Sequence, residues 1–197
     1  MKSKKHIIYM AAGNSRRFGE NKLLSHYRGK ALYRHGLDML IGVVGDREDV
    51  ELTVVSQYRE ILDYAEEHGL RAVDSPGSRE GVSYTIKAGI GSPENIEDGD
   101  CLIFVVADQP LLSAGTIGKF LDFADDEAYA DCNAAAAYGE QNGNPVLFRA
   151  RMLPRLLALQ GDEGGRKALI DSPCHRIFTD TAGELQDIDV KEDLRSF

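Results

Sequence analysis

Short apolar runs alternate with longer amphipathic segments along the whole chain. Residues 7–12 and 101–107 are almost uninterruptedly apolar, as in strands that a sheet buries on both faces. Residues 50–55 predict a further strand, and residues 134–138 and 145–148 predict two more toward the carboxyl end. Strands are therefore expected throughout the chain rather than in one part of it.

The segments between these strands have the spacing of apolar positions that is typical of helices. Predicted helices cover residues 31–44, 58–68, 83–88, 113–124, 150–159 and 164–171. Gly69 ends the second of them, and Ser113 is placed as an N-cap. This alternation predicts an α/β fold with three layers, in which a mostly parallel sheet carries helices on both faces. No repeat or linker divides the sequence, so residues 1–197 are expected to form a single domain.

Two loops follow predicted strand ends, one after Ala12 and one after Ala107. Open sheets of this kind bind ligands in a crevice beyond the carboxyl ends of their strands. Both loops are therefore expected to face the same crevice.

Composition narrows the class of protein further. Hydrophobic residues make up 43% and charged residues 28% of the sequence, and no apolar run approaches the roughly 18 residues of a membrane span. The basic start runs into a short apolar stretch and a glycine-arginine loop instead of a cleavage site, so a cytoplasmic protein is expected. Cys101, Cys132 and Cys174 are far apart and odd in number, which predicts reduced, buried thiols instead of disulfides or a zinc site.

The charge is unevenly distributed. The chain has a net charge of −9, yet residues 1–35 carry nine basic side chains against one acidic side chain, Glu20. An acidic protein with one basic segment is unsuited to general nucleic-acid binding and well suited to holding one compact polyanion. Lys2, Lys4 and Lys5 are expected to be solvated surface charges.

The loop after the first predicted strand has the chemistry of a phosphate-binding segment. Its small residues at 11–13 would let a base or ribose approach the main chain closely, and glycine can turn N–H groups toward an anion. Arg17 offers a planar fork to phosphate oxygens, and Lys22 offers a point charge. The alternative is a surface turn with incidental arginines.

Two acidic segments are candidate metal sites. Asp108 directly follows a buried apolar strand, where it could hold Mg²⁺, an ion that prefers one or two carboxylates plus phosphate oxygens. Asp187 and Asp189 alternate with apolar residues, which would place both on one side of a strand end. Either could complete the metal site, and capping of a terminal helix is the competing explanation.

Two further segments are less specific. Ser83 could lie at a helix N-terminus facing the nucleotide, just after Gly81, and residues 143–148 could form the wall of an acceptor site. Judged by chemistry alone, both segments are ordinary turns.

Together these segments resemble the MobA-like nucleotidyltransferases, and most closely the molybdenum cofactor cytidylyltransferases. The matching motifs are A-[AG]-G-x-S-x-R-[MF]-G-x-x-K at 11–22, E-G-x-x-x-[ST] at 80–85, D-x-P at 108–110, G-x-P-V at 143–146, G-D-x-G-x-R at 161–166 and D-x-D-[TV]-x-E-D at 187–193. Their order is kept over nearly the whole chain. The resemblance implies a Rossmann-like nucleotidyltransferase fold and transfer of CMP from CTP, with Mg²⁺, to the terminal phosphate of molybdopterin, which releases pyrophosphate.

The resemblance also implies roles for individual residues. Catalytic residues would be Arg17, Lys22 and Asp108; nucleotide-binding residues Ala11, Ala12, Gly13, Ser15, Arg17, Lys22, Gly81 and Ser83; metal ligands Asp108 and Asp189; and acceptor-binding residues Gln109 and Asn144. Ala12 resembles the cytidylyl branch, because the guanylyl branch commonly has glycine there. Asn144 departs from the histidine that is usual in this branch, and Val190-Lys191 from the common Thr-Pro.

Two alternatives stay open at the level of sequence. The acceptor could be a sugar phosphate or polyol phosphate, or the donor could be GTP. A protein of another class, a nucleotide-binding accessory protein that serves a molybdoenzyme without turnover, would keep the same loop.

Overall fold

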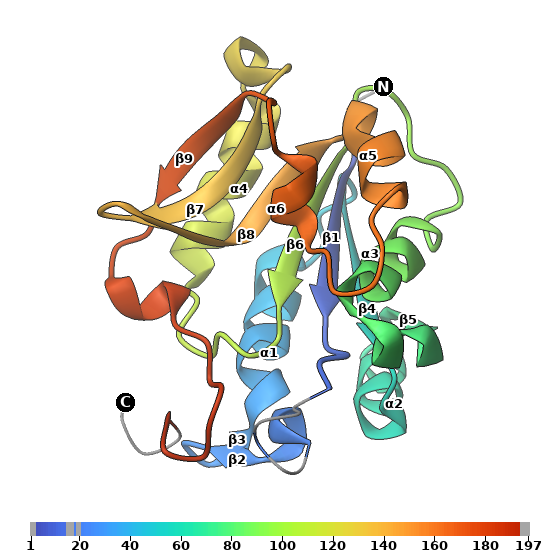
Figure 1. The fold of residues 1–197 in the computed structure, drawn as a ribbon, viewed down its shortest axis with the longest axis vertical. Helices are drawn as coiled ribbons and strands as arrows, with labels where there is room; N and C mark the ends of the chain where they lie inside the picture. Colours follow the sequence, from blue (N-terminus) through green and yellow to red (C-terminus); the bar gives the residue numbers. More distant parts are fainter. Residues whose placement is uncertain (1–2, 15–17, 19–20, 194–197) are drawn as a thin grey trace.

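The computed structural model describes residues 3–14, 18 and 21–193, and it is built around a seven-stranded sheet (Figure 1). The strand order is β5-β4-β1-β6-β8-β7-β9. The strands are β1 (Lys5–Met10), β4 (Val50–Ser56), β5 (Arg71–Asp74), β6 (Cys101–Val106), β7 (Asn133–Tyr138), β8 (Gln141–Arg149) and β9 (Cys174–Phe178). Of these strands β8 pairs antiparallel with both neighbours, and the other pairings are parallel. The prediction of a mostly parallel sheet is confirmed.

Helices cover both faces of this sheet. They are α1 (Leu32–Val44), α2 (Arg59–Glu67), α3 (Val82–Ile90), α4 (Ala114–Asp125), α5 (Leu153–Leu157) and α6 (Gly165–Ala168), with short 3-10 turns η1 (Lys22–Leu24), η2 (Pro76–Glu80), η3 (Glu127–Tyr129), η4 (Ala150–Met152) and η5 (Ala182–Leu185). A small second sheet pairs β2 (His26–Tyr27) with β3 (Lys30–Ala31). None of the helices among the described residues has both the length and the apolar character to cross a membrane.

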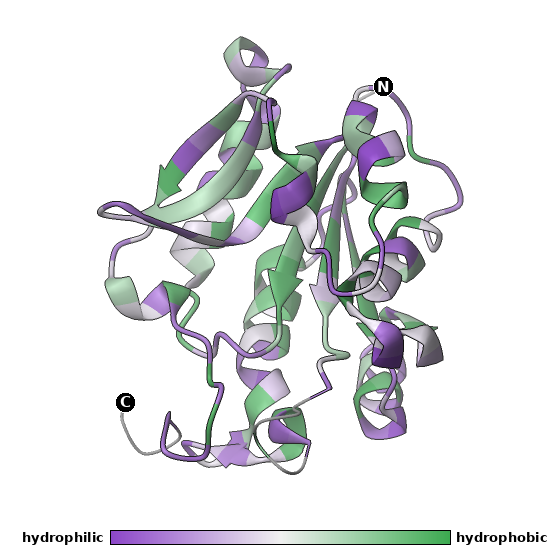
Figure 2. Cartoon of the chain, in the orientation of Figure 1, coloured by the Kyte–Doolittle hydropathy of each residue, from purple (hydrophilic) through white to green (hydrophobic). Residues whose placement is uncertain are grey.

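The alternation of side chains along the central strands produces two hydrophobic clusters. In β6, Ile103 and Val105 pack with residues of α1, α2 and α4, whereas Leu102 and Phe104 pack with residues of α3, α5 and α6. Figure 2 shows the apolar colouring concentrated on the central strands and the helices beside them. This is the predicted three-layer arrangement: the sheet buries both faces, and each helix layer buries one apolar face against it.

Strands β1 and β6 are direct neighbours and end at the same level. Their last residues, Met10 and Val106, are register partners, and both are half-buried although every other residue of the two strands is buried. The loops after both strands consequently open at one edge of the sheet, as expected from the sequence.

Several expectations were wrong in detail. Residues 187–189 have no regular secondary structure, because Ile188 hydrogen-bonds through its N–H to the Asp108 carbonyl of the neighbouring loop instead of pairing in a sheet (2.9 Å). The predicted helices 150–159 and 164–171 are short helices and turns. Lys5 is fully buried, paired with Asp49 (2.9 Å) and Asp125, and is no surface charge.

The three cysteines are free, as predicted, but only Cys101 is buried. Cys174 begins the edge strand β9 and is exposed, and Cys132 is intermediate. Lys4 is partly exposed, as expected, and pairs with Glu51 (2.5 Å). Lys2 lies outside the described residues.

Candidate active site

A cavity of about 290 Å³ opens at the carboxyl ends of β1 and β6. Its lining residues are Met10, Ala12, Gly13, Asn14, Lys22, Leu23, Ser78, Val82, Thr85, Val106, Ala107, Asp108 and Asp162. The loop after β1 and the loop after β6 therefore share one cavity. Of the residues expected to bind the nucleotide, Ala12, Gly13 and Lys22 line it, and Asp108 lies beside them.

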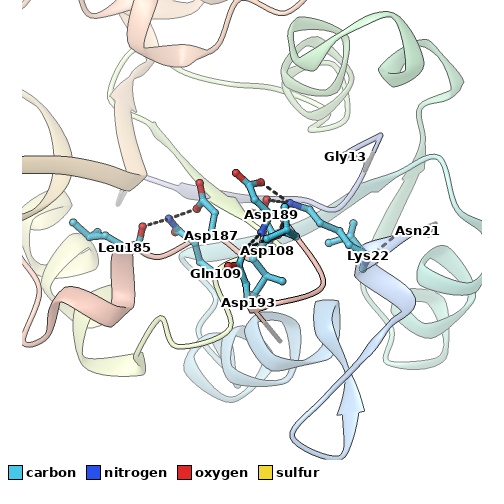
Figure 3. Close-up of polar contacts among 12 residues, drawn as sticks. Gly13, Asn21, Lys22, Asp108, Gln109, Leu185, Asp187, Asp189 and Asp193 are labelled. Carbon is cyan, nitrogen blue, oxygen red and sulfur yellow. Dashed lines mark hydrogen bonds and ion pairs between the residues drawn. The ribbon is translucent and has the colours of Figure 1, made fainter. Parts of the chain in front are cut away.

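The most strongly charged feature of this cavity is the ion-pair cluster around Lys22. The Lys22 Nζ donates to Asp108 Oδ2 (2.8 Å), to Asp189 Oδ1 (3.2 Å) and to the Ile188 carbonyl (2.7 Å) (Figure 3). Asn21 places the lysine, because its side chain accepts from the Leu23 N–H (3.1 Å) and caps η1. Three segments far apart in the sequence thus converge on one ammonium group.

Lys22 is charged in this setting. It is only 6% exposed, and burial by itself would lower its pKa. The carboxylates of Asp108 and Asp189 outweigh that effect and raise the pKa of Lys22 above its ordinary value. The cluster is thus a cation held between two anions.

Asp187 is placed differently from Asp189. Its Oδ1 accepts from the Gln109 Nε2 (2.8 Å), so it turns away from Lys22 (Figure 3). Although the residue keeps solvent contact, partial burial of its carboxyl group, with the Asp108 carboxylate nearby, raises the pKa of Asp187 to about 6. Of the two C-terminal aspartates, Asp189 is therefore the one that shares a cation with Asp108.

The donor set at Lys22 fits a magnesium-like ion. Asp108 and Asp189 present carboxylate oxygens to the same nitrogen, and such an ion takes one or two carboxylates and leaves its other positions to phosphate oxygens and water. Among the described residues no group of three or more His, Cys, Asp or Glu side chains is arranged to hold a metal by itself. The site therefore suits an ion that arrives with a phosphate-bearing substrate.

The loop after β1 is fixed from outside the cavity by three consecutive side chains at the carboxyl end of β4. Ser56 Oγ donates to the Ala11 carbonyl (2.7 Å), Gln57 Nε2 to the Ala12 carbonyl (2.6 Å), and Tyr58 OH to the Gly13 carbonyl (2.8 Å). Residues 56–58 were not singled out in the sequence. The signal that could have found them is their polar character at the end of a buried strand that lies beside β1 in a parallel sheet.

Three other expected nucleotide-binding residues lie behind the cavity wall. Ala11 and Ser83 are fully buried, and Gly81 is buried as well. Gly81 has φ +146°, and an added Cβ would lie 2.2 Å from the Gly161 carbonyl carbon, so only glycine fits where this turn meets the loop at residue 161. Ser83 donates its N–H to the Gly161 carbonyl (3.0 Å). These contacts attach the loop that carries Asp162 to the cavity.

A second cavity, of about 310 Å³, adjoins the first across a ridge formed by Met10, Val82 and Val106, which line both. Its other lining residues are Ile86, Phe104, Asn144, Val146, Phe148, Gly164, Gly165, Arg166 and Lys167. The residues expected to bind the acceptor differ in placement. Asn144 lines this cavity, whereas Gln109 is 2% exposed, lines neither cavity and donates to Asp187.

Ser15 and Arg17 lie outside the described residues, so their expected contacts with a triphosphate stay predictions. On either side of them, Ala12, Gly13 and Asn14 and then Lys22 and Leu23 line the first cavity.

Comparison with known proteins agrees with this fold. Residues 7–177 match the MobA-like NTP transferase domain, and the chain belongs to this family of nucleotidyltransferases. It is 25% identical to the purine catabolism protein PucB of Bacillus subtilis (strain 168), over 94% of this chain and 92% of that protein. Enzymes of this family generally depend on a divalent metal ion.

Solved structures show the same fold. Rv0371c from Mycobacterium tuberculosis H37Rv superposes with a TM-score of 0.78 at 19% identity, covering 100% of this chain and 98% of that one. Another structure of that protein is a complex with manganese. It superposes with a TM-score of 0.76 at 19% identity, covering 98% of this chain and 97% of that one. The nucleotidyl transferase Mth528 from Methanothermobacter thermautotroptrophicus superposes with a TM-score of 0.77 at 18% identity, covering 98% of this chain and 95% of that one.

Proposed function

We propose that this nucleotidyltransferase moves a nucleoside monophosphate from a triphosphate to a phosphate-bearing acceptor and releases pyrophosphate. The observation that carries the proposal is the convergence of Lys22, Asp108 and Asp189 on the rim of a cavity walled by the loops after β1 and β6. A site that joins a cation, two metal-ligating carboxylates and a closely approachable main chain suits a triphosphate.

The chain's own residues would act through position and charge. Lys22 would pair with phosphate oxygens and offset charge on the departing pyrophosphate, and Arg17 is predicted to share this role. Asp108 and Asp189 would hold Mg²⁺, which supplies Lewis-acid stabilisation of charge at the attacked phosphoryl group when bound. An acceptor phosphate is already ionised near pH 7, so the reaction needs no general base.

The donor in this proposal is CTP. Ala12, as in the cytidylyl branch that the sequence resembles, lines the cavity beside Gly13. GTP is the alternative donor.

The acceptor in this proposal is molybdopterin, which presents a ring system and a terminal phosphate. The second cavity supports an acceptor with an apolar body, because its walls are largely aliphatic and aromatic side chains, including Ile86, Val146 and Phe148. The hydroxyl groups of a sugar or polyol phosphate would lose water there without gaining enough partners. Asn144 lines this cavity, so its side-chain amide would meet a polar group on the ring.

A specific test measures pyrophosphate release from CTP, GTP, UTP and ATP with Mg²⁺, with and without molybdopterin. Turnover should require molybdopterin and should fall at least a hundredfold in Asp108→Asn, since one carboxylate of the metal site is lost. The exposed Asp98→Asn is the matched control and should keep wild-type activity. Full activity in Asp108→Asn would contradict the metal assignment, and nucleotide binding without release would support the accessory role.

The acceptor assignment has its own test. Arg166 and Arg176 both contact Asn142, through its carbonyl and its side chain respectively, but only Arg166 lines the second cavity. Arg166→Gln should raise the KM for molybdopterin about tenfold, the loss of one charged contact, and Arg176→Gln should leave it unchanged. Equal effects of both substitutions would remove the second cavity from the acceptor site.

A further inference from the structure

Asp108 and Asp189, the two proposed metal ligands, belong to segments that are far apart in the sequence. Asp108 lies in the loop after β6, and Asp189 lies near the end of the chain, in a segment without regular secondary structure. Two carboxylates bind one ion only when both lie within coordination distance of it. The contacts between the two segments therefore decide whether such a site can form.

Two groups of the loop after β6 hold the C-terminal segment. The Asp108 carbonyl accepts from the Ile188 N–H (2.9 Å), and the Ile188 side chain is buried. The Gln109 Nε2 donates to the Leu185 carbonyl (3.3 Å) and to Asp187 Oδ1 (2.8 Å) (Figure 3). One side-chain amide thus joins the loop to two residues of the segment that leads to the second proposed ligand.

Lys22 holds the same segment, but its contacts depend on its place between the carboxylates. Its Nζ donates to the Ile188 carbonyl (2.7 Å) as well as to Asp108 and Asp189. In the proposed function a bound triphosphate would draw this ammonium group toward phosphate oxygens. The contacts of Gln109 do not involve Lys22, so they would persist when the substrate binds.

Stability alone does not explain the amide of Gln109. The residue is 2% exposed, and no described residue donates to its buried Oε1. A buried acceptor without a donor costs free energy, and an apolar side chain of similar length would avoid that cost. Gln109 also lines neither of the two cavities of the candidate site, which leaves the C-terminal segment as the partner of its amide.

We propose that Gln109 is a positioning residue: it keeps Asp189 within reach of the proposed metal ion after Lys22 has moved to the phosphates. Its amide fixes the Leu185 carbonyl and the side chain of Asp187, which is only two residues from Asp189. Loss of the amide should therefore weaken metal binding although both proposed ligands remain. The inference rests on the proposed function, namely a triphosphate and a metal ion bound in the first cavity.

The test is calorimetric titration of the full chain with CTP, once with saturating Mn²⁺ and once in EDTA. In wild type Mn²⁺ should tighten CTP binding about tenfold or more, since the ion offsets charge on the triphosphate. Gln109→Met removes the amide from an unbranched side chain. It should weaken CTP binding about tenfold with Mn²⁺ and no more than about twofold in EDTA. Gln186→Met replaces an exposed glutamine of the same segment and should change neither affinity.

Asp187 allows the same contact to be tested from its other side, at an exposed position, even if Gln109→Met fails to fold. Asp187→Asn keeps an oxygen that can accept from Gln109, whereas Asp187→Leu does not. CTP binding with Mn²⁺ should weaken about tenfold in Asp187→Leu and no more than about threefold in Asp187→Asn. Equal, large losses in both variants would make Asp187 a metal ligand and would overturn the inference.

The outcomes separate this inference from the proposed function. A Mn²⁺ effect that Gln109→Met and Asp187→Leu leave unchanged, or a loss of the same factor with Mn²⁺ and in EDTA, would overturn the inference and leave the transferase proposal intact. The expected losses without pyrophosphate release in the presence of molybdopterin would do the reverse. A wild-type chain whose CTP binding Mn²⁺ does not strengthen would overturn both the proposed metal site and this inference.

Discussion

Lys22 lies between Asp108 and Asp189, the two residues proposed to hold the metal ion, with its Nζ 2.8 and 3.2 Å from their carboxylate oxygens. An ammonium and a divalent ion cannot both occupy the space between these two oxygens, because like charges at contact distance repel strongly in a partly buried site. Metal binding at the proposed site would therefore require Lys22 to leave, and a triphosphate would give it a new partner. Metal and nucleotide should load together.

Removal of the lysine should consequently strengthen the binding of metal alone. Lys22→Met should lower the Kd for Mn²⁺ without nucleotide about tenfold, since one competing charge is gone, and should weaken triphosphate binding. Electron paramagnetic resonance of free Mn²⁺ during titration measures the first effect. Lys119→Met, which removes a surface lysine paired with Asp180 (2.7 Å), is the matched control. Unchanged or weaker Mn²⁺ binding in Lys22→Met would show that the lysine does not occupy the metal position.

Asp187 should make the stability of the metal-free protein depend on pH. Its pKa is raised to about 6 in the folded state, so the folded chain retains a proton that the unfolded chain loses near pH 4. The contribution of Asp187 to the free energy of unfolding therefore falls as pH rises from about 4 to about 6, and it stays lower above pH 6. Asp187→Asn should raise the Tm at pH 8 and give no gain at pH 4. A gain that is the same at both pH values would show that charge is not the cause.

At the scale of elements, Glu184 in η5 attaches the aspartate-bearing C-terminal segment to α4. Its buried carboxylate accepts from the Ser113 N–H (3.0 Å), the Thr116 hydroxyl (2.6 Å) and the Asp180 N–H (3.0 Å). Burial opposes ionisation, but the donors, chiefly the Thr116 hydroxyl, lower the pKa of Glu184 below its ordinary value. Asp189 follows within five positions, so η5 sets where its carboxylate meets Lys22.

Loss of this attachment should be costly. Glu184→Ala should reduce the free energy of unfolding by about 3 kcal/mol, because several donors lose a charged partner, whereas Ser113→Ala, which removes only the N-cap, should cost about 1 kcal/mol. Urea denaturation at pH 7 measures both. Equal effects of the two substitutions would contradict the anchoring role of the carboxylate.

The elements that the sequence predicted well are those whose buried positions follow a regular pattern. Strands β1 and β6 are covered on both faces, and α1 and α4 carry clear apolar stripes, so their patterns were unambiguous. In the edge strands β5 and β9 only Ile177 is buried, so these strands have no such pattern. The contacts of residues 56–58 with the loop after β1 depend on strand order, which local pattern does not encode.

Candidate site residues divide in the same way. Lys22, Asp108 and Asp189 converge in the structure. They could be predicted because each lies next to a feature visible in the sequence: a glycine loop, a strand end and an acidic motif. Gly81 and Ser83 matched a motif too, but their structural contacts are with the loop at residue 161 rather than with the cavity. A motif identifies a segment, and packing decides which of its side chains face the ligand.

For the whole molecule, the fold places two unlike cavities on either side of a ridge at the ends of β1 and β6. The first is bordered by Lys22 and Asp108, and the second has apolar walls with Arg166 and Lys167 at its border. A triphosphate in one and a ring-bearing phosphate in the other would meet at Met10, Val82 and Val106. That adjacency suits the proposed transfer between two bound substrates.

A crystal structure of the chain with CTP and Mn²⁺ tests this account most directly, because anomalous scattering locates the ion independently of the phosphates. We expect the ion bound to Asp108 and Asp189, Lys22 on phosphate oxygens, and the nucleotide in the cavity that Ala12 and Gly13 line. A nucleotide bound elsewhere, or an ion that contacts neither aspartate while Lys22 keeps its present pairs, would contradict the account.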